Sequence, residues 1–479
     1  MSNSIIILGA GPAGLACAYK ILKESGKKVV IIDQAPKIGG AGASFRWKGH
    51  ILDYGPHAFH TRGGEPEKLI RNLFMEDQKL LIEGRKRVQV FLNGKRFRYP
   101  LQVAEALLKF NPLLSLRIIF EFALTSIFHA IVSIPIENFE NWGRKRFGST
   151  LYRLSFGDYT EKVWKTSPSK ISEKFATEKI QGFNFINLLK RLLRVGGQVT
   201  EPYYQTWIYH KYGSGSLFDK LAHEIIAMGG EILLSHKLKS IEISESSINF
   251  IKLEKEGNQV HLPCGYLVST IPLPHLVLSF DNKGVPFAVR YAASKLRYTA
   301  LILVYIEFNM EKVSDDHWFY LLEKKFVSNR VTEQKNLSVY TMEPGKTVLM
   351  FELSCRLNDA LWRLTDKEIF QLVKNDCDKI NFIQTDKISD YLIKRIPNVY
   401  EIYYKGFDQY SEIILSYLSE FQNIVSIGRK GLFLQGDMHQ SIEMGLSIGS
   451  LLAQERVDVS EIRKFYRKYV GYIENEKCE

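Results

Sequence analysis

The sequence predicts an α/β fold, α+β over the whole chain, in which a parallel sheet is interrupted by a second domain of helices and sheet. Three observations lead to this prediction. An apolar run, Ile5–Leu8, precedes a glycine-rich turn, a helical pattern and a second apolar run, which is typical of a β-α-β unit. From Leu101 to about Leu193, apolar residues recur at helical spacing. Strand-like runs follow at 298–308, 348–353 and 423–429.

The glycine-rich turn is the best-defined motif. Gly9, Gly11 and Gly14 have the G-x-G-x-x-G spacing, with Pro12 and Ala13 before the last glycine. Glycine at these places allows a sharp turn, lets a pyrophosphate approach the backbone, and lets the next helix pack close to the strand. That helix presents N–H groups and the positive end of its dipole to the phosphates. We therefore expect a dinucleotide here.

The residues after the turn specify which dinucleotide. Asp33 ends the second strand, where a carboxylate accepts from ribose hydroxyls, and Gln34 follows it. A second glycine pair, Gly39-Gly40, comes next, and then the segment Gly55-Pro56-His57. This order resembles the extended signature of two-domain FAD flavoproteins such as amine oxidases, protoporphyrinogen oxidases and UDP-galactopyranose mutases. The resemblance implies FAD as the cofactor, bound by a Rossmann-like domain.

Composition narrows the class of protein. The 479 residues are too many for one ordinary domain, and 45% hydrophobic with 24% charged residues indicates a globular chain. The net charge of +12 favours acidic partners, but no basic tract carries a nucleic-acid motif, so we expect no nucleic-acid partner. The five cysteines show no C-x-x-C spacing, and no signal peptide fits the N-terminus. We expect a cytoplasmic enzyme with a small-molecule substrate.

One stretch, Leu113–Ile136, is apolar enough to suggest a membrane. Arg117, Glu121 and His129 interrupt it, and Pro135 closes it, so a spanning helix is not expected. Two interpretations stay open. In the first, the stretch forms buried helices of the second domain. In the second, it is a peripheral membrane patch or the mouth of a tunnel for a lipid-linked substrate, at the inner face of the membrane.

The elements in chain order suggest a discontinuous organisation. We expect a short helix at 68–74, a hairpin turning on Asn93-Gly94, a helix over 217–226, strands over 231–234, 241–256 and 260–268, and helices over 366–377 and 438–454. The expected parts are as follows: FAD-binding domain, residues 1–95; helical substrate domain, 96–204; FAD-binding domain, 205–290; substrate-domain sheet, 291–399; FAD-binding domain, 400–479.

Further segments resemble the UDP-galactopyranose mutase family in order along nearly the whole chain. They are Tyr54–Thr61, Phe147–Tyr152, Tyr159–Trp164, Arg330–Lys335 and Gly428–Met438. The resemblance implies that Tyr159 and Trp164 line the active site and that Arg330 stabilises the flavin and a substrate diphosphate. It further implies that Gly428, Arg429, Asp437 and Met438 contact the cofactor. A guanidinium can bind phosphate oxygens bidentately, and aromatic rings offer faces for a base or sugar.

Two departures from the mutase pattern keep the reaction open. Apolar residues and an amide, Leu432–Gly436, stand where the mutases have tyrosines, and Gly182 stands where a second phosphate-binding Arg is expected. The first alternative is an oxidoreductase of the protoporphyrinogen-oxidase or amine-oxidase type, which accepts a hydride at flavin N5 from an apolar or carrier-linked substrate. The second is a mutase that isomerises a nucleotide sugar through a reduced-flavin N5 adduct.

Some polar residues have a functional and a structural interpretation. His57 and His60 are expected beside the flavin ring, where they would move protons, or else they are structural. Asp437 is expected to cap a helix. Glu333 and Lys335 are most simply interpreted as a surface pair. The Asp315–His317 segment contains ligand types without a metal-binding spacing, so we expect no metal.

Overall fold

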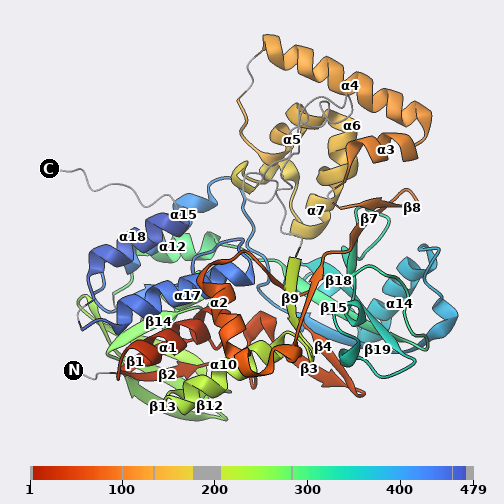
Figure 1. Cartoon of the computed structure of the whole chain (residues 1–479). Coiled ribbons are helices and arrows are strands. Elements are labelled where there is room, and N and C mark those ends of the chain that lie inside the picture. Colours follow the sequence, from red (N-terminus) through yellow and green to blue (C-terminus); the bar gives the residue numbers. More distant parts are fainter. Residues whose placement is uncertain are drawn as a thin grey trace. The chain divides into compact units, whose positions relative to one another are not determined.

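The computed structural model describes residues 4–99, 101–132, 135–175, 206–281, 284–455 and 457–470. The chain divides into two compact units (Figure 1). Unit 1 comprises Met1–Glu83, Trp207–Arg297 and Phe407–Glu479, and unit 2 comprises Gly84–Thr206 and Tyr298–Gly406. The boundaries expected from the sequence differ from these by at most 12 residues, the largest difference being 95 against 83.

Unit 1 is built on a five-stranded parallel sheet in the order β10-β2-β1-β14-β20. Its strands are β10 (Glu231–Leu233), β2 (Lys28–Ile32), β1 (Ser4–Leu8), β14 (Tyr266–Ser269) and β20 (Ile424–Ser426). Continuous apolar runs form β1 and β2 because both faces of a parallel sheet are covered. The predicted β-α-β unit is confirmed, and it lies at the centre of this sheet.

The first and last long helices of unit 1 pack directly on each other. These are α1 (Pro12–Glu24) and α17 (Met438–Ala453). A Cβ added to Gly445 would lie 2.3 Å from the carbonyl oxygen of Ala13, and one added to Gly449 would lie 2.6 Å from Cβ of Lys20. Only glycine allows so close an approach of the two backbones. The other helices of unit 1 are α2 (Gly64–Leu73), α10 (Gly215–Ala227), α11 (Leu273–Leu278), α12 (Phe287–Lys295), α15 (Phe407–Leu418), α16 (Gly428–Gly431) and α18 (Val459–Val470).

Three small sheets complete this part of the chain. They are β3 (Ser44–Trp47) with β4 (His50–Asp53); β5 (Phe59–His60), β9 (Thr206–His210) and β6 (Leu81–Arg85); and β11 (Lys237–Ser244), β12 (Ser247–Lys255) and β13 (Asn258–Pro263). The single strand expected over 241–256 is wrong. The chain turns at Glu245, which has a φ of +51°, and no glycine at that place signals the turn.

Unit 2 contains a seven-stranded sheet in the order β19-β15-β18-β17-β16-β7-β8. Its strands are β19 (Ile388–Ile396), β15 (Ala300–Phe308), β18 (Thr347–Cys355), β17 (Arg330–Glu333), β16 (Trp318–Leu321), β7 (Val88–Leu92) and β8 (Lys95–Arg98). Apolar side chains of one face form a core with helix α14 (Asp366–Asp378). The predicted hairpin is confirmed, with positive φ at Asn93 and Gly94. It belongs to unit 2, although the sequence assigned residues up to 95 to the first domain.

The helices of unit 2 precede most of its sheet in the chain. They are α3 (Val103–Lys109), α4 (Pro112–Ile131), α5 (Phe139–Phe147), α6 (Ser149–Tyr152), α7 (Asp158–Trp164) and α13 (Ala360–Arg363). The interpretation of Leu113–Ile136 as buried helices is wrong, because the window Pro112–His129 of α4 is only 6% buried. This window is also long and apolar enough to cross a membrane by length and composition. Residues 176–193 of the expected helical stretch, including Gly182, lie outside the described residues.

Candidate functional site

The glycine-rich turn joins β1 to α1 at the carboxyl edge of the parallel sheet. Gly9 has a φ of +107°, and an added Cβ would lie 2.1 Å from Oγ1 of Thr270. A Cβ on Gly14 would lie 2.0 Å from the carbonyl oxygen of Gly9. Both positions therefore require glycine, the first for the turn and the second for the close approach of helix to strand.

The N-terminus of α1 has the chemistry of a phosphate site. Gly11 is its N-cap and Pro12 its first residue, and no described side chain caps the helix. Its first turn holds no acidic residue, so no carboxylate competes for the N–H groups of Ala13 and Gly14. Uncapped N–H groups and the positive end of the helix dipole favour an anion at this place.

Asp33 lies at the end of β2, beside that turn. Its Oδ2 accepts from the Ala10 N–H and its Oδ1 from the Ala35 N–H, both at 2.8 Å. Each carboxylate oxygen keeps a further lone pair, so the same group can still accept from ribose hydroxyls. Gln34, the next residue, is exposed.

The second glycine pair closes onto the first motif. The Gly39 N–H donates to the Ala10 carbonyl at 2.8 Å. Gly40 has a φ of +55°, and an added Cβ would lie 3.2 Å from Cα of Gly11. The backbone of 39–40 therefore lies against the turn that is expected to hold the pyrophosphate.

The C-terminal segment Gly428–Met438 begins beside the first turn of α1, also within unit 1. Gly428 begins α16 with a φ of +78°, and an added Cβ would lie 3.0 Å from Cβ of Ala13. Arg429 is half-buried. Asp437 stands at the N-cap of α17, as expected, and its Oδ2 accepts from Nη2 of Arg62 at 2.6 Å. Met438 lies beside Gly42, since an added Cβ on that glycine would be 3.3 Å from Cε of the methionine.

The segment Gly55-Pro56-His57 is held in a compact bend. The His57 N–H donates to the Gly55 carbonyl at 2.8 Å. Gly55 has a φ of +154°, and an added Cβ would lie 2.9 Å from Cε1 of the His57 ring. Asp53, just before it, accepts from the Tyr209 hydroxyl at 2.5 Å, and burial raises the pKa of this carboxyl to about 6. His57 and His60 are both half-buried.

The structure brings Tyr159 and Arg330, both in unit 2, around the ring of Tyr320. The Tyr159 and Tyr320 rings meet edge to face at 5.9 Å, and the Arg330 guanidinium lies 5.9 Å from the Tyr320 ring. Burial raises the pKa of Tyr159 well above its usual range, so the phenol stays protonated. Trp164 packs edge-on against Phe175 instead, and no described residue bonds its buried Nε1.

Arg330 is held by a buried carboxylate. Its Nε and Nη2 donate to the two oxygens of Glu352 at 2.6 and 2.9 Å. Glu352 stands opposite Arg330 in the register of β17 and β18. Burial acts to lower the pKa of Arg330, but the charge of Glu352 outweighs it and raises the pKa well above its usual value. Sequence reasoning missed Glu352, although a lone acid in the apolar run Val348–Leu353 implies a paired charge.

Lys162, one turn after Tyr159 on α7, occupies a cage of backbone carbonyls. Its Nζ donates to the carbonyls of Leu321, Glu323 and Ser328 at 2.5, 3.1 and 2.9 Å. Burial lowers the pKa of Lys162 to about 7. This residue fixes α7 against the loop between β16 and β17, and hence fixes Tyr159 beside Tyr320. Sequence reasoning did not predict that Lys162 anchors α7, although the residue lies within the motif Tyr159–Trp164.

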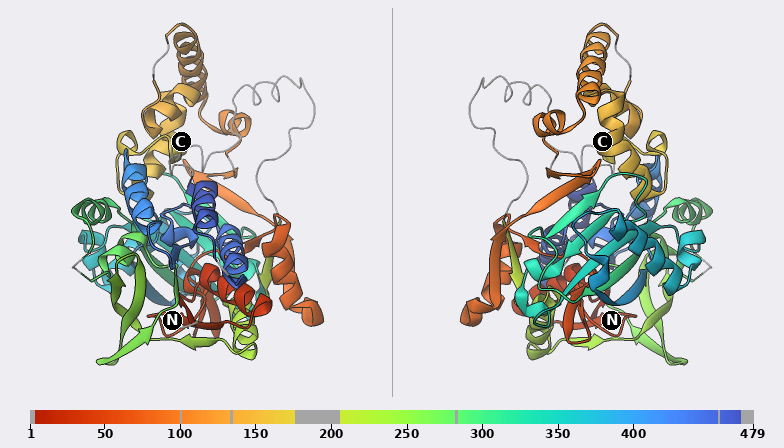
Figure 2. Two further views of the ribbon diagram at one scale, coloured as in Figure 1. Left: turned by 90° about the vertical axis from the view of Figure 1, so that its left-hand side faces the viewer. Right: turned by 90° about the vertical axis from the view of Figure 1, so that its right-hand side faces the viewer.

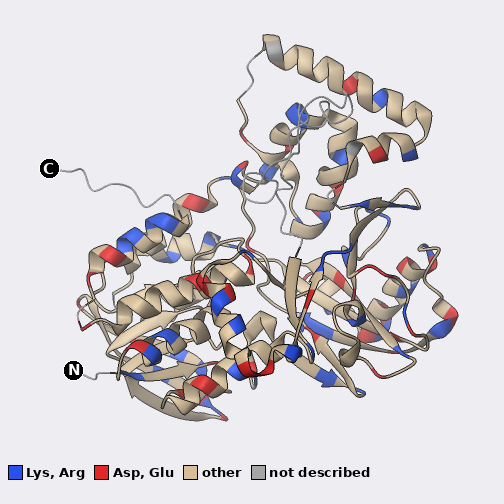
Figure 3. Ribbon diagram, in the orientation of Figure 1, with Lys and Arg blue, Asp and Glu red and all other residues tan. Residues whose placement is uncertain are grey.

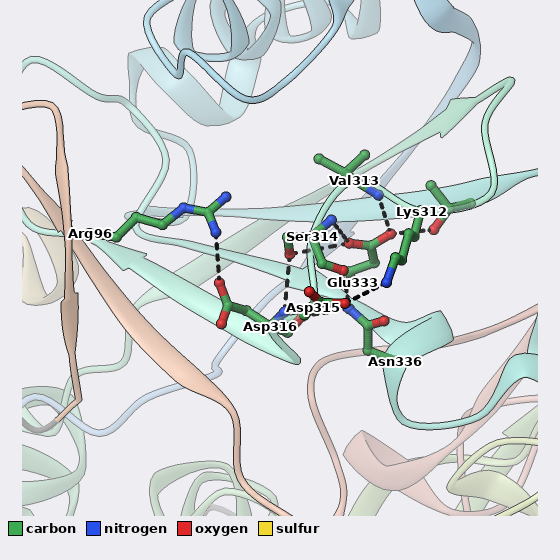
Figure 4. Close-up of polar contacts among 9 residues, drawn as sticks. Arg96, Lys312, Val313, Ser314, Asp315, Asp316, Glu333 and Asn336 are labelled. Carbon is green, nitrogen blue, oxygen red and sulfur yellow. Dashed lines mark hydrogen bonds and ion pairs between the residues drawn. The ribbon is translucent and has the colours of Figure 1, made fainter.

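The expected surface pair of Glu333 and Lys335 is wrong. Glu333 is buried and accepts from the Val313 and Ser314 N–H groups at 2.8 Å (Figure 4). Lys335 is buried too, and it pairs with Glu311. The neighbouring Asp315 and Asp316 pair with different cations, Lys312 and Arg96, rather than converging on one point. This cluster anchors a loop to the end of β17.

The family of the chain follows from comparison with known proteins. A family model described as flavin-containing amine oxidoreductase matches residues 12–441. The chain belongs to this family. Its cofactor is accordingly FAD, and the uncapped α1 N-terminus, the glycine cradle and Asp33 in unit 1 fit that cofactor.

Solved structures with the same fold cover nearly the whole chain. A reduced UDP-galactopyranose mutase has a TM-score of 0.81 at 19% identity, covering 98% of each chain. A putative protoporphyrinogen oxidase from Exiguobacterium sp. 255-15 has a TM-score of 0.72 at 17% identity, covering 95% of this chain and 100% of the other. At such identities the likeness shows the fold alone.

A curated relative matches over a short stretch. Coproporphyrinogen III oxidase of Bacillus subtilis (strain 168) is 29% identical over 77 residues, which is 15% of this chain and 16% of that protein. The family, the cofactor and the α/β flavoprotein fold are therefore as the sequence predicted.

Proposed function

We propose that this chain is an FAD-dependent oxidoreductase of the protoporphyrinogen-oxidase or amine-oxidase type, acting on an apolar or carrier-linked small molecule. The bound flavin supplies the hydride acceptor at N5. The observation that carries the proposal is the bidentate pair of Arg330 with Glu352. A guanidinium already neutralised by a carboxylate has little charge left for a nucleotide diphosphate.

The segment before α17 supports the same choice. Leu432 and Phe433 are fully buried where the mutase pattern has tyrosines, and the Phe433 ring lies 6.0 Å from that of Phe407. Buried apolar side chains bind no phosphate, but they exclude water from a hydride-transfer site. An apolar substrate is the better match to these residues.

Each candidate residue receives a specific role in this proposal. The N–H groups at Gly11–Gly14 hold the pyrophosphate, and Asp33 accepts from the ribose. Gln34, Gly39-Gly40, Gly55-Pro56, Gly428-Arg429 and Asp437-Met438 complete the cofactor site. His57 moves a proton beside the flavin ring. Tyr159 and Trp164 offer the substrate aromatic faces, and Arg330 orients Tyr320 and Tyr159.

A nucleotide-sugar mutase is the second candidate. The cluster of Tyr159, Tyr320 and Arg330 favours it, because an aromatic face beside a guanidinium also suits a nucleotide diphosphate. In this alternative Arg330 would have to leave Glu352 and bind the substrate.

Two anaerobic measurements separate these candidates. In the first, candidate amines, porphyrinogens and isoprenoids are added to the oxidised holoenzyme, and loss of the flavin absorbance band identifies an oxidoreductase substrate. In the second, dithionite-reduced enzyme is incubated with a UDP-hexose. Sugar isomerisation without net electron transfer would replace the oxidoreductase proposal with the mutase.

We also propose a cytoplasmic location, with peripheral contact at the inner face of a membrane. The described cysteines, Cys17, Cys264, Cys355 and Cys377, are buried free thiols, which suits a reducing compartment. Cys478 lies outside the described residues.

A further inference from the structure

Helix α4 exposes apolar side chains along its entire length. Six of them follow helical spacing and are 51% to 80% exposed: Leu113, Leu116, Phe120, Leu124, Ile127 and Ile131. Ile118, by contrast, points into the protein and is buried. Figure 2 shows α4 at the outer end of unit 2, away from the seven-stranded sheet. A soluble protein rarely leaves so continuous an apolar row in water.

The width of this row indicates the kind of partner. At about 100° per residue, Ile119 and Phe128 lie roughly 80–100° to either side of the row's centre, and they are 52% and 48% exposed. The apolar surface therefore covers about half of the helix circumference, which is wider than the narrow seam of a two-helix coiled coil. Half-immersion in a bilayer interface buries such a surface completely.

The ion pairs around the row expose their basic side chains more than their acidic ones. Three ion pairs join residues four apart, one on each of α3, α4 and α5, and in each the basic partner is more exposed than the acidic one. These pairs are Lys109–Glu105, Arg117–Glu121 and Arg144–Glu140. Glu121 is also turned inward, since it accepts from the N–H and hydroxyl of Thr150 at 2.7 and 2.8 Å. Figure 3 shows charge to be sparse along the rest of α4.

We propose that α4, with the neighbouring Leu108 at the end of α3, docks in the plane of an anionic lipid bilayer. At 20 residues, α4 spans about 30 Å of that plane. Leu108 is the most exposed apolar side chain of this region, at 87%. The apolar row enters the acyl boundary, and the cations, which are more exposed than the carboxylates that they pair with, add a weak attraction to the lipid phosphates.

The experiment is flotation of the FAD-loaded full-length protein with vesicles. We expect it to float with vesicles of phosphatidylcholine and phosphatidylglycerol, less with phosphatidylcholine alone, and less at high salt. Phe120→Glu with Leu124→Glu should lower the bound fraction about tenfold or more, because two apolar contacts are replaced by repelled charges. Flavin absorbance and thermal melting check that the double variant is folded, and Leu124→Gln repeats the test with a milder change.

The matched control is Phe287→Glu on α12, where an apolar ring is 82% exposed outside this surface. It should float like the wild type. Absence of wild-type binding, or an equal loss in Phe287→Glu, would overturn the proposal. A second result would also overturn it: the wild type binds no vesicles but forms a dimer in light scattering, and the double variant is a monomer. The apolar row would then be the contact between two copies of the chain. Vesicle binding needs no turnover, so its failure leaves the proposed reaction untouched.

Discussion

Arg330 and Glu352 stand opposite each other on neighbouring strands, and their side chains form two parallel hydrogen bonds of 2.6 and 2.9 Å. The pair is almost fully buried on the carboxylate side. A buried pair costs desolvation and is retained where geometry matters. Here it fixes the guanidinium beside Tyr320, and through that ring it fixes Tyr159.

Replacing Arg330 by Ala should reduce kcat/KM by about a hundredfold or more while the FAD content stays unchanged. The turn and the carboxylate that are proposed to hold the cofactor belong to unit 1, so their geometry does not depend on this side chain. Because the variant leaves Glu352 unpaired, Arg330→Met combined with Glu352→Gln serves as the folding control. Normal turnover in the Ala variant would remove Arg330 from the site.

Replacing Asp33 by Ala should weaken FAD binding about tenfold to a hundredfold. Hydrogen bonds to a charged group contribute roughly 1.5–3 kcal/mol, and the ribose would lose its acceptor. Fluorescence titration of the apoprotein with FAD measures the change. Lys37→Ala, at an exposed position four residues further along the chain, should bind FAD with nearly unchanged affinity; a loss equal to that of Asp33→Ala would show that the carboxylate is not what FAD contacts.

Replacing Gly14 by Ala should destabilise unit 1 and lower its FAD content. The new Cβ would lie 2.0 Å from the Gly9 carbonyl oxygen, which is backbone and cannot turn aside. The matched control is Gly26→Ala, whose Cβ would have no atom within 4 Å and which should be neutral or gain about 0.4–1 kcal/mol. Thermal unfolding of the two holoproteins decides the point, since equal melting temperatures would contradict the role of Gly14.

Lys162 should make stability depend on pH above neutrality. Its pKa falls to about 7 in the folded chain, against about 10.4 unfolded, so between these values the unfolded chain binds more protons. The free energy of unfolding therefore rises with pH between these two values. The part of it that comes from the neutral Lys162 side chain is lost as the pH falls toward 7. Urea unfolding from pH 6.5 to 10.5 should show that the wild type gains free energy of unfolding relative to Lys162→Met as the pH rises. Parallel curves would argue against a depressed pKa.

Local patterns in the sequence were sufficient to predict much of unit 1. The run Ile5–Leu8, the glycine spacing and Asp33 specify a β-α-β unit because each feature acts over a few residues. Asn93-Gly94 predicted its hairpin for the same reason. The family and cofactor follow from these local features, whose order along the chain is itself a strong signal.

What the sequence could not predict depends on contacts between distant residues. Glu352 meets Arg330 only through the register of β17 and β18, and Lys162 finds carbonyls about 160 residues away. The exposure of α4 was left open between two interpretations, because hydropathy reports the chemistry of a side chain and not what covers it. The chain turns at Glu245, where no glycine signals a turn, so the single strand expected over 241–256 is divided between two strands.

The packing of Gly445 on Ala13 has a consequence for synthesis. Helix α1 ends at Glu24, and the helix that it packs against begins only at Met438. Strand β20, at one edge of the parallel sheet, is made almost as late. The surroundings of the glycine-rich turn are therefore complete only once α17 has been synthesised, so a flavin that needs these surroundings binds after α17 has formed and not when α1 first appears.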